Sequence, residues 1–121
     1  MRWSVCFCHF FTRRRPWTPA TELAQLQAQG QAFTLLDVRR DSARQQDGTQ
    51  IAHAQWHNPA QWLEWKDQVP KDLPVVVYCA HGHEIGQGLT TVLRVMGLNA
   101  RYLDGGIAAW QAAGLATEPA V

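Results

Sequence analysis

Cys79 is the residue of this 121-residue chain whose neighbours are most typical of a catalytic nucleophile. It follows an apolar run at positions 74–78 that is rich in valine and predicts a short buried strand. A loop with glycine comes next, and then a segment, 89–96, whose apolar residues recur at helical spacing. A strand–loop–helix turn presents free backbone N–H groups and the positive end of the helix dipole to the loop, which favours a thiolate. The sequence therefore predicts that Cys79 attacks a substrate.

A buried structural cysteine is the alternative interpretation of Cys79, because free cysteine is among the residue types most often buried. The residues that follow it argue against a core position. Gly82 allows a tight backbone path, while His81, His83 and Glu84 are polar where a core segment would continue with apolar side chains. This part of the chain therefore favours a functional loop.

Strands and helices are predicted to alternate along the rest of the chain. Apolar runs at 33–38 and 100–103 predict further strands, and Gly105-Gly106 predicts a turn into a last helix with Trp110 as a core anchor. The glycines would also let this turn approach the Cys79 loop closely. Such alternation is typical of an open parallel α/β sheet, whose carboxyl strand ends line one crevice. Cys79 is expected to lie in that crevice.

Several element boundaries carry capping signals. Thr18 is predicted as the N-cap of a helix, with Pro19 at its first position, and Gly30 as its end. Gly97 is predicted to end the helix that follows the Cys79 loop. The polar segment 41–50 is predicted to be a loop or a frayed helix.

Four aromatic side chains lie between positions 56 and 65. Asn58-Pro59 is predicted to begin a short helix that carries Trp62 and Trp65, whose helical spacing favours packing over ligand binding. Trp56 and His57 are candidates for the rim of the site.

Three segments, in this order, resemble motifs of the rhodanese (sulfurtransferase) family. Leu35–Arg39 is similar to the family's strand ending in Asp-Val-Arg, Cys79–Gly82 to its Cys-x-x-Gly loop, and Tyr102–Trp110 to its Leu-x-Gly-Gly-x-x-x-Trp signature. The resemblance covers roughly residues 17–115. It implies an open parallel sheet of four to five strands with helices on both faces.

Two-step sulfur transfer is the activity that this resemblance implies. The Cys79 thiolate would take a sulfane sulfur from thiosulfate or a persulfide donor, and a thiophilic acceptor would then remove it. Backbone N–H groups of the next six residues would hold the persulfide: Ala80, His81, Gly82, His83, Glu84 and Ile85. Asp37 and Arg39 would support this loop from a second layer. The resemblance implies no metal and no organic cofactor; the partners are a small sulfur donor and a thiol acceptor, which could also be a protein.

The chain departs from the family pattern in the loop. Many members carry arginine, followed by serine or threonine, where this chain has Glu84 and Ile85. A carboxylate opposes both an anionic donor and a thiolate, although His81 and His83 could compensate. His53 stands where the family usually has glycine, which leaves the local turn in doubt.

Two other functions remain open. A phosphatase or arsenate reductase of similar architecture needs an arginine clamp for its oxyanion, typically in a Cys-x5-Arg loop, and residue 85 is isoleucine. A catalytically silent rhodanese-like module for binding or sensing is favoured by Glu84 and opposed by the retained Cys79.

Composition limits the partners and the compartment. A net charge of +1 gives no reason to expect a nucleic-acid or membrane partner. Three cysteines cannot all pair in one chain, which indicates a reducing compartment such as the cytoplasm. Residues 1–16 are expected to form a flexible arm ahead of the domain at 17–121. Cys6, Cys8 and His9 lack a second cluster at zinc-like spacing, so no metal site is expected there.

Overall fold

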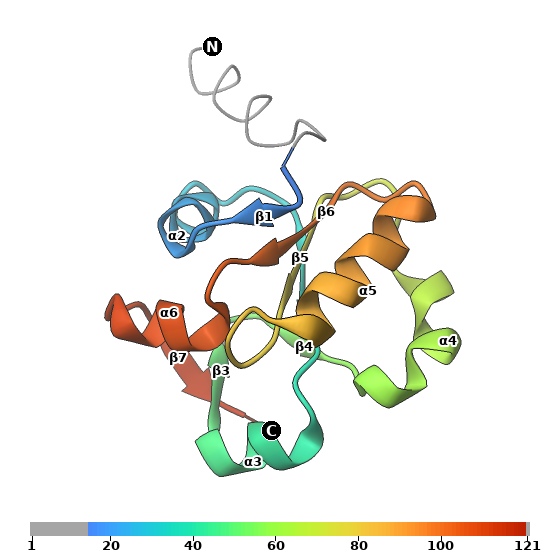
Figure 1. Cartoon of the computed structure of the whole chain (residues 1–121). Coiled ribbons are helices and arrows are strands. Elements are labelled where there is room, and N and C mark those ends of the chain that lie inside the picture. The colour runs from blue at the N-terminus through green and yellow to red at the C-terminus, as the bar shows by residue number, and fades with distance from the viewer. Residues whose placement is uncertain (1–14, 121) are drawn as a thin grey trace.

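The computed structural model describes residues 15–120, which form a parallel sheet with helices on both faces (Figure 1). All neighbouring strands of this five-stranded sheet run parallel. In spatial order the strands are β1 (Trp17–Thr18), β6 (Ala100–Leu103), β5 (Val75–Tyr78), β2 (Thr34–Asp37) and β4 (Gln55–Trp56). The predicted fold class, an open parallel α/β sheet of four to five strands, is confirmed.

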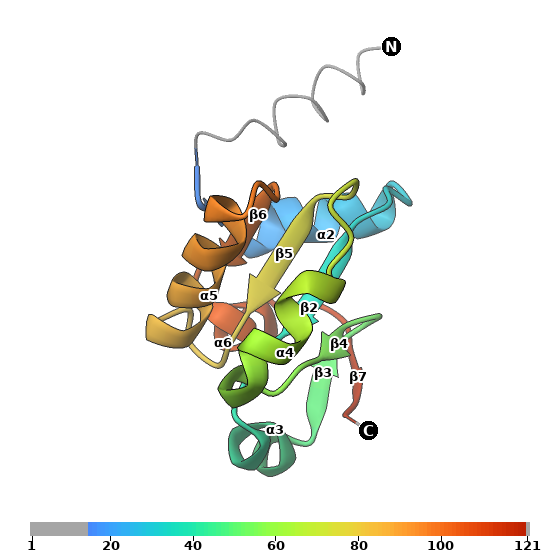
Figure 2. The same ribbon diagram turned by 90° about the vertical axis from the view of Figure 1, so that its right-hand side faces the viewer.

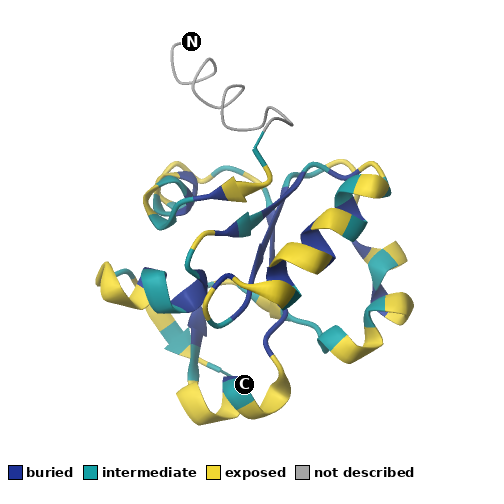
Figure 3. Ribbon diagram, in the orientation of Figure 1, coloured by how far each residue is buried: buried dark blue, intermediate teal, exposed yellow. Residues whose placement is uncertain are grey.

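Successive side chains of β5 point into two different apolar layers. Val75 and Val77 pack into one layer, and Val76 and Tyr78 pack into the other. Four helices supply the facing side chains: α4 (Trp62–Trp65) and α5 (Glu84–Val95) on the first side, and α2 (Ala20–Ala28) and α6 (Gly106–Ala112) on the second (Figure 2). Because both faces are covered, the central strands are buried along their length (Figure 3).

The first helix begins one residue later than predicted. Pro19 is the N-cap of α2 rather than its first helical residue. Thr18 belongs to β1, where it pairs with Leu103 of β6, and its hydroxyl donates to the Glu22 carboxylate at 3.0 Å. Thr18, which was predicted to cap the helix, is therefore part of a strand instead. The predicted end is confirmed, because Gly30 follows α2 with a left-handed φ of 68°.

Segment 41–50 is more regular than predicted. It forms α3 (Asp41–Asp47), which ends at Gly48 with a φ of 75°, and the start of β3 (Thr49–Ile51). β3 pairs antiparallel with β7 (Thr117–Pro119) in a second, two-stranded sheet. Strands of three residues are too short to leave a periodic pattern in the sequence.

The helical segment after β4 begins as predicted. Asn58 Oδ1 accepts a backbone N–H at 3.0 Å, with Pro59 as the first residue of the 3-10 helix η1 (Pro59–Gln61). α4 follows, and then a second 3-10 helix, η2 (Lys66–Gln68). Trp65 is buried, and its Nε1 donates to the Asn58 carbonyl at 2.8 Å. The packing role predicted for this tryptophan is confirmed.

The turn that the sequence left in doubt is present. His53 has a φ of 70° and is the only non-glycine residue with a positive φ within the described range. Glycine adopts this conformation at no steric cost, whereas a histidine is mildly strained in it. No helix of residues 15–120 is long and apolar enough to cross a membrane.

Candidate active site

Cys79 lies where the chain leaves β5 and turns towards α5. The residue is 6% exposed, and its Sγ accepts a hydrogen bond from the backbone N–H of Gly82 at 3.2 Å. The connecting loop is shorter than predicted, because α5 begins at Glu84 and takes Glu84 and Ile85 into its first turn. The sulfur is therefore held by a tight turn, residues 80–83, directly before a helix N-terminus.

Gly86, in the first turn of α5, leaves space beside the sulfur. A Cβ at this position would lie 3.2 Å from the Cys79 Sγ, closer than most real Cβ contacts. Gly88, in the same helix, has no neighbouring atom within 4 Å of its equivalent position. Glycine at residue 86 therefore keeps free the space next to the Cys79 thiol.

The N-terminus of α6 supports the Cys79 turn. The backbone N–H of Ile107 donates to the Cys79 carbonyl at 3.0 Å, and that of Ala108 donates to the Ala80 carbonyl at 3.0 Å. Gly106 makes this approach possible, because a Cβ there would lie 2.5 Å from the Cys79 carbonyl oxygen. The predicted close approach of the Gly105-Gly106 turn is confirmed.

Asp37 and Arg39 form a buried ion pair at the end of β2. Arg39 Nη2 donates to Asp37 Oδ2 at 2.8 Å, and Arg39 Nε donates to Asp37 Oδ1 at 3.0 Å. Arg39 also donates to Asp47 Oδ2 at 3.0 Å and to the Thr49 carbonyl at 2.7 Å. Burial alone would lower the pKa of Arg39, but the hydrogen bonds and charge of Asp37 raise it above its usual value. Arg39 is therefore held in its charged form.

Tyr78 connects this ion pair to the strand that carries Cys79. Its hydroxyl donates to Asp37 Oδ2 at 3.1 Å and accepts the backbone N–H of Ile51 at 3.2 Å. Burial and the charge of Asp37 raise the pKa of Tyr78, so the hydroxyl keeps the proton that it donates. Sequence reasoning did not single out Tyr78, although a hydroxyl at the end of a buried apolar strand signals a need for polar partners.

A cavity of about 690 Å³ opens over Cys79. Most of the predicted loop residues line it: Ala80, His81, His83, Glu84 and Ile85. The rings of His81 and His83 are exposed, with their centroids 6.3 Å apart. The structure thus brings the exposed residues His81, His83 and Glu84 to the wall of the cavity that Cys79 also lines.

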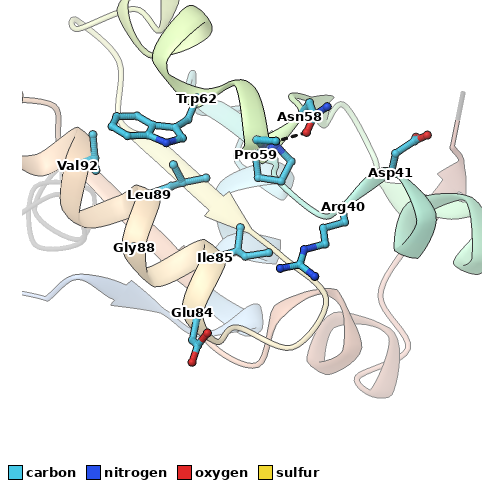
Figure 4. Close-up of a pocket in the computed structure, with 11 residues that line it drawn as sticks. Arg40, Asp41, Asn58, Pro59, Trp62, Glu84, Ile85, Gly88, Leu89 and Val92 are labelled. Atoms are coloured by element: carbon cyan, nitrogen blue, oxygen red, sulfur yellow. Dashed lines mark hydrogen bonds between the residues drawn. The ribbon is translucent and has the colours of Figure 1, made fainter.

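Arg40 also lines this cavity and was not among the predicted site residues. It occupies the N-cap position of α3, three residues after β2 ends, at an edge of the sheet where parallel α/β proteins often bring polar residues together. A groove of about 580 Å³ between η1 and α5 shares Arg40, Glu84 and Ile85 with the cavity (Figure 4). Its other walls are largely apolar and include Pro59, Trp62, Leu89 and Val92.

Trp56 and His57 do not contribute to the wall of either cavity. Trp56 donates from Nε1 to the Arg39 carbonyl at 2.9 Å, and His57 stacks on Trp65 with ring centroids 4.9 Å apart. Burial lowers the pKa of His57, which favours its neutral form. Trp56 therefore packs beside Arg39 and His57 packs on Trp65, and neither lies at the rim of the site.

Residues 19–113 match the rhodanese-like domain. The chain belongs to the rhodanese-like domain family. A rhodanese-related protein from Thermoplasma volcanium is 25% identical, with a TM-score of 0.74 over 84% of this chain and 96% of that one. A rhodanese-like domain from Anabaena is 28% identical, with a TM-score of 0.74 over 88% of this chain and 80% of that one.

A third structural neighbour carries a different description. This protein of unknown function from Rhodopseudomonas palustris, described as a possible tyrosine phosphatase, is 24% identical, with a TM-score of 0.73. The match covers 86% of this chain and 85% of that one, and it shows the shared fold alone. A search of curated proteins finds no match to this chain.

Metal ligands are not grouped in the part of this rhodanese-like domain that the structure describes. Within residues 15–120, no three His, Cys, Asp or Glu side chains are placed to hold a metal ion together. Cys6, Cys8 and His9 lie outside the described residues.

Proposed function

We propose that this rhodanese-like domain is a sulfurtransferase that carries a sulfane sulfur on Cys79. One observation carries the proposal: the Cys79 Sγ accepts the Gly82 N–H at 3.2 Å at the N-terminus of α5, inside an open cavity. A backbone N–H and a helix N-terminus both favour a sulfur anion. The cavity gives a small donor access to it.

In the first step the Cys79 thiolate attacks the outer sulfur of the donor. A new Sγ–S bond forms, and the donor's own bond to that sulfur breaks. With thiosulfate, the bonding electron pair leaves on sulfite; with a persulfide donor, it leaves on a thiolate. The product is a Cys79 persulfide, and no outside oxidant or reductant is needed.

In the second step a thiophilic acceptor attacks the outer sulfur of the persulfide. The Sγ–S bond breaks, its electron pair returns to Cys79, and the thiolate is ready for another turnover. Cyanide serves as this acceptor in an assay, and a small thiol or a protein thiol is the proposed physiological acceptor. The cycle needs a reduced Cys79, so we further propose a reducing compartment such as the cytoplasm.

Backbone geometry supports the persulfide state. The first N–H groups of a helix have no intrahelical partner, and in α5 these belong to the turn that begins at Glu84. Gly86 leaves room beside the Sγ. A persulfide anion therefore has both donors and space next to the residue that would carry it.

A binding module without catalysis is the second candidate, because Glu84 occupies the mouth of the cavity. A carboxylate there repels thiosulfate and any other anionic donor. Phosphate-ester hydrolysis is less favoured, since Ile85 stands where a Cys-x5-Arg loop carries the arginine that clamps the oxyanion.

The test is steady-state sulfur transfer to cyanide, with thiosulfate and with an organic persulfide as alternative donors. The proposal predicts thiocyanate formation by the full chain with at least one donor, and none by Cys79→Ser, which folds equally well because the substitution is nearly isosteric. Turnover by Cys79→Ser would contradict the proposal. Absence of turnover with every donor, in a protein that is folded, would favour the binding module.

A further inference from the structure

Arg40 lies at the mouth of the Cys79 site, and its side chain has no partner among the described residues. Its side chain is exposed, and within residues 15–120 it makes no hydrogen bond and no ion pair. It nevertheless lines both the cavity over Cys79 and the adjoining groove. Figure 4 shows its guanidinium extending from the start of α3 towards Ile85 at the start of α5. The cation is therefore directed at the site and available to a ligand.

The neighbouring Arg39 cannot bind a ligand without losing hydrogen bonds that it makes within the protein. All three of its guanidinium nitrogens donate hydrogen bonds, to Asp37, Asp47 and the Thr49 carbonyl. Arg39 is also 2% exposed, whereas Arg40 is exposed. Of these two consecutive arginines, only Arg40 can bind a ligand without first giving up hydrogen bonds within the protein.

The carboxylate at the mouth does not neutralise Arg40. Glu84 lines the same two cavities but forms no ion pair with Arg40, and in Figure 4 its carboxylate points away from the guanidinium. The site thus has a cation on the α3 side and an anion on the α5 side. An anionic ligand is attracted to the first and repelled by the second.

We propose that Arg40 is the anion-binding residue of the Cys79 site. It would hold the negatively charged group of a donor, such as the sulfonate-like group of thiosulfate, while the attached sulfane sulfur faces Cys79. A guanidinium suits this task because its planar fork can donate two hydrogen bonds to two oxygens of one anion. The inference rests on the proposed sulfur transfer for its choice of donor, but not for the anion site itself.

The first test is alkylation of Cys79 and does not depend on sulfur transfer. Iodoacetate and iodoacetamide react with the same thiolate and differ in the charge of the reagent, so the ratio of their rates reports on anion binding. The rate at Cys79 is followed by peptide-resolved mass spectrometry of the full chain, which separates this thiol from Cys6 and Cys8. Arg40→Gln should lower the iodoacetate-to-iodoacetamide ratio about three- to tenfold, and Arg40→Lys should retain part of it.

Lys71→Gln is the matched control for net charge. It removes the same unit of charge from an exposed residue that precedes β5, at the opposite end of the strand from Cys79. The ratio should not change in this variant. An unchanged ratio in Arg40→Gln, or an equal loss in Lys71→Gln, would overturn the assignment.

The second test uses sulfur donors and separates this inference from the proposed function. Arg40→Gln should raise the KM for thiosulfate about three- to tenfold, and raise it less for an organic persulfide, which has no sulfonate-like oxygens for the guanidinium to hold. Equal kinetics of wild type and Arg40→Gln with thiosulfate would refute the Arg40 role and leave sulfur transfer intact. An Arg40-dependent alkylation ratio without sulfur transfer from any donor would support the anion site and refute the sulfurtransferase.

Discussion

The two sides of Cys79 differ in how their charges are held. On the inner side, Asp37 and Arg39 are almost fully buried, and every charged nitrogen of Arg39 has a partner. On the outer side, Arg40 and Glu84 are exposed and make no ion pair with each other. The inner charges are tied to the backbone at Thr49, and we propose that the outer charges select the ligand. Mutations on the two sides should therefore change different measurements.

Asp37→Asn should have the largest effect on stability. It leaves the Arg39 guanidinium buried without its main counter-charge, and breaking such a pair typically costs about 3–5 kcal/mol. Urea unfolding should show this loss in the free energy of unfolding. Arg40→Gln, one residue after Arg39, is the matched control and should change stability by less than about 0.5 kcal/mol. Similar losses in the two variants would remove the distinction between the inner and outer sides.

Gly86→Ala should slow the chemistry without unfolding the protein. The added Cβ would crowd the Cys79 Sγ at 3.2 Å, so we expect persulfide formation to slow about tenfold or more, while the helix itself gains roughly 0.5–1 kcal/mol from alanine. Rapid-mixing kinetics and thermal unfolding measure the two effects separately.

Gly88→Ala is the control in the same helix. Its Cβ would meet no atom within 4 Å, so it should give the same helical stabilisation and no change in rate. Equal rates in Gly86→Ala and Gly88→Ala would show that the space beside the sulfur is not needed.

Glu84→Gln should have a smaller effect, opposite in sign to that of Arg40→Gln. Removing the carboxylate from the mouth of the cavity should raise kcat/KM for thiosulfate about two- to fivefold at low ionic strength. The gain should fade as salt is added, because exposed charges are screened. A drop in kcat/KM would mean that Glu84 takes part in the reaction.

The smallest expected effect is a pH dependence of stability that comes from His57. This residue belongs to neither the inner nor the outer charges of the site. Its pKa is lowered by burial, so the unfolded chain binds its proton more readily than the folded one. The free energy of unfolding is therefore highest above the usual histidine pKa of roughly 6.5 and decreases as the pH falls below it. Unfolding curves between pH 5 and pH 8 should show a slope that His57→Gln reduces, whereas the same slope in both proteins would assign it to another group.

Most of the fold could be predicted because its strands are buried on both faces and leave long apolar runs in the sequence. β6 begins and ends at the predicted residues, and the glycine turn before α6 contacts the Cys79 loop as expected. β1, β3 and β7 could not be predicted, since strands of two or three residues carry no periodicity. Pairing of β1 with β6 also explains why Thr18 does not cap α2.

The site could be predicted only in part, because sequence motifs describe neighbours along the chain. Cys79 and its loop form one continuous motif, which identified Cys79 and most of the cavity wall. Arg40 reaches the site through the sheet, which brings the ends of β2 and β5 together, and the same pairing brings Asp37 to the hydroxyl of Tyr78. Charged residues at the end of a buried parallel strand were the available signal for Arg40.

The most direct test of the central claim is intact-protein mass spectrometry after incubation with thiosulfate or an organic persulfide. The proposed mechanism predicts a gain of one sulfur atom in the full chain, no gain in Cys79→Ser, and loss of the added mass when cyanide is supplied. Cys79→Ser keeps Cys6 and Cys8, so it also reports any sulfur carried elsewhere. A gain that persists in Cys79→Ser, or no gain with either donor, would contradict the claim that Cys79 carries the sulfur.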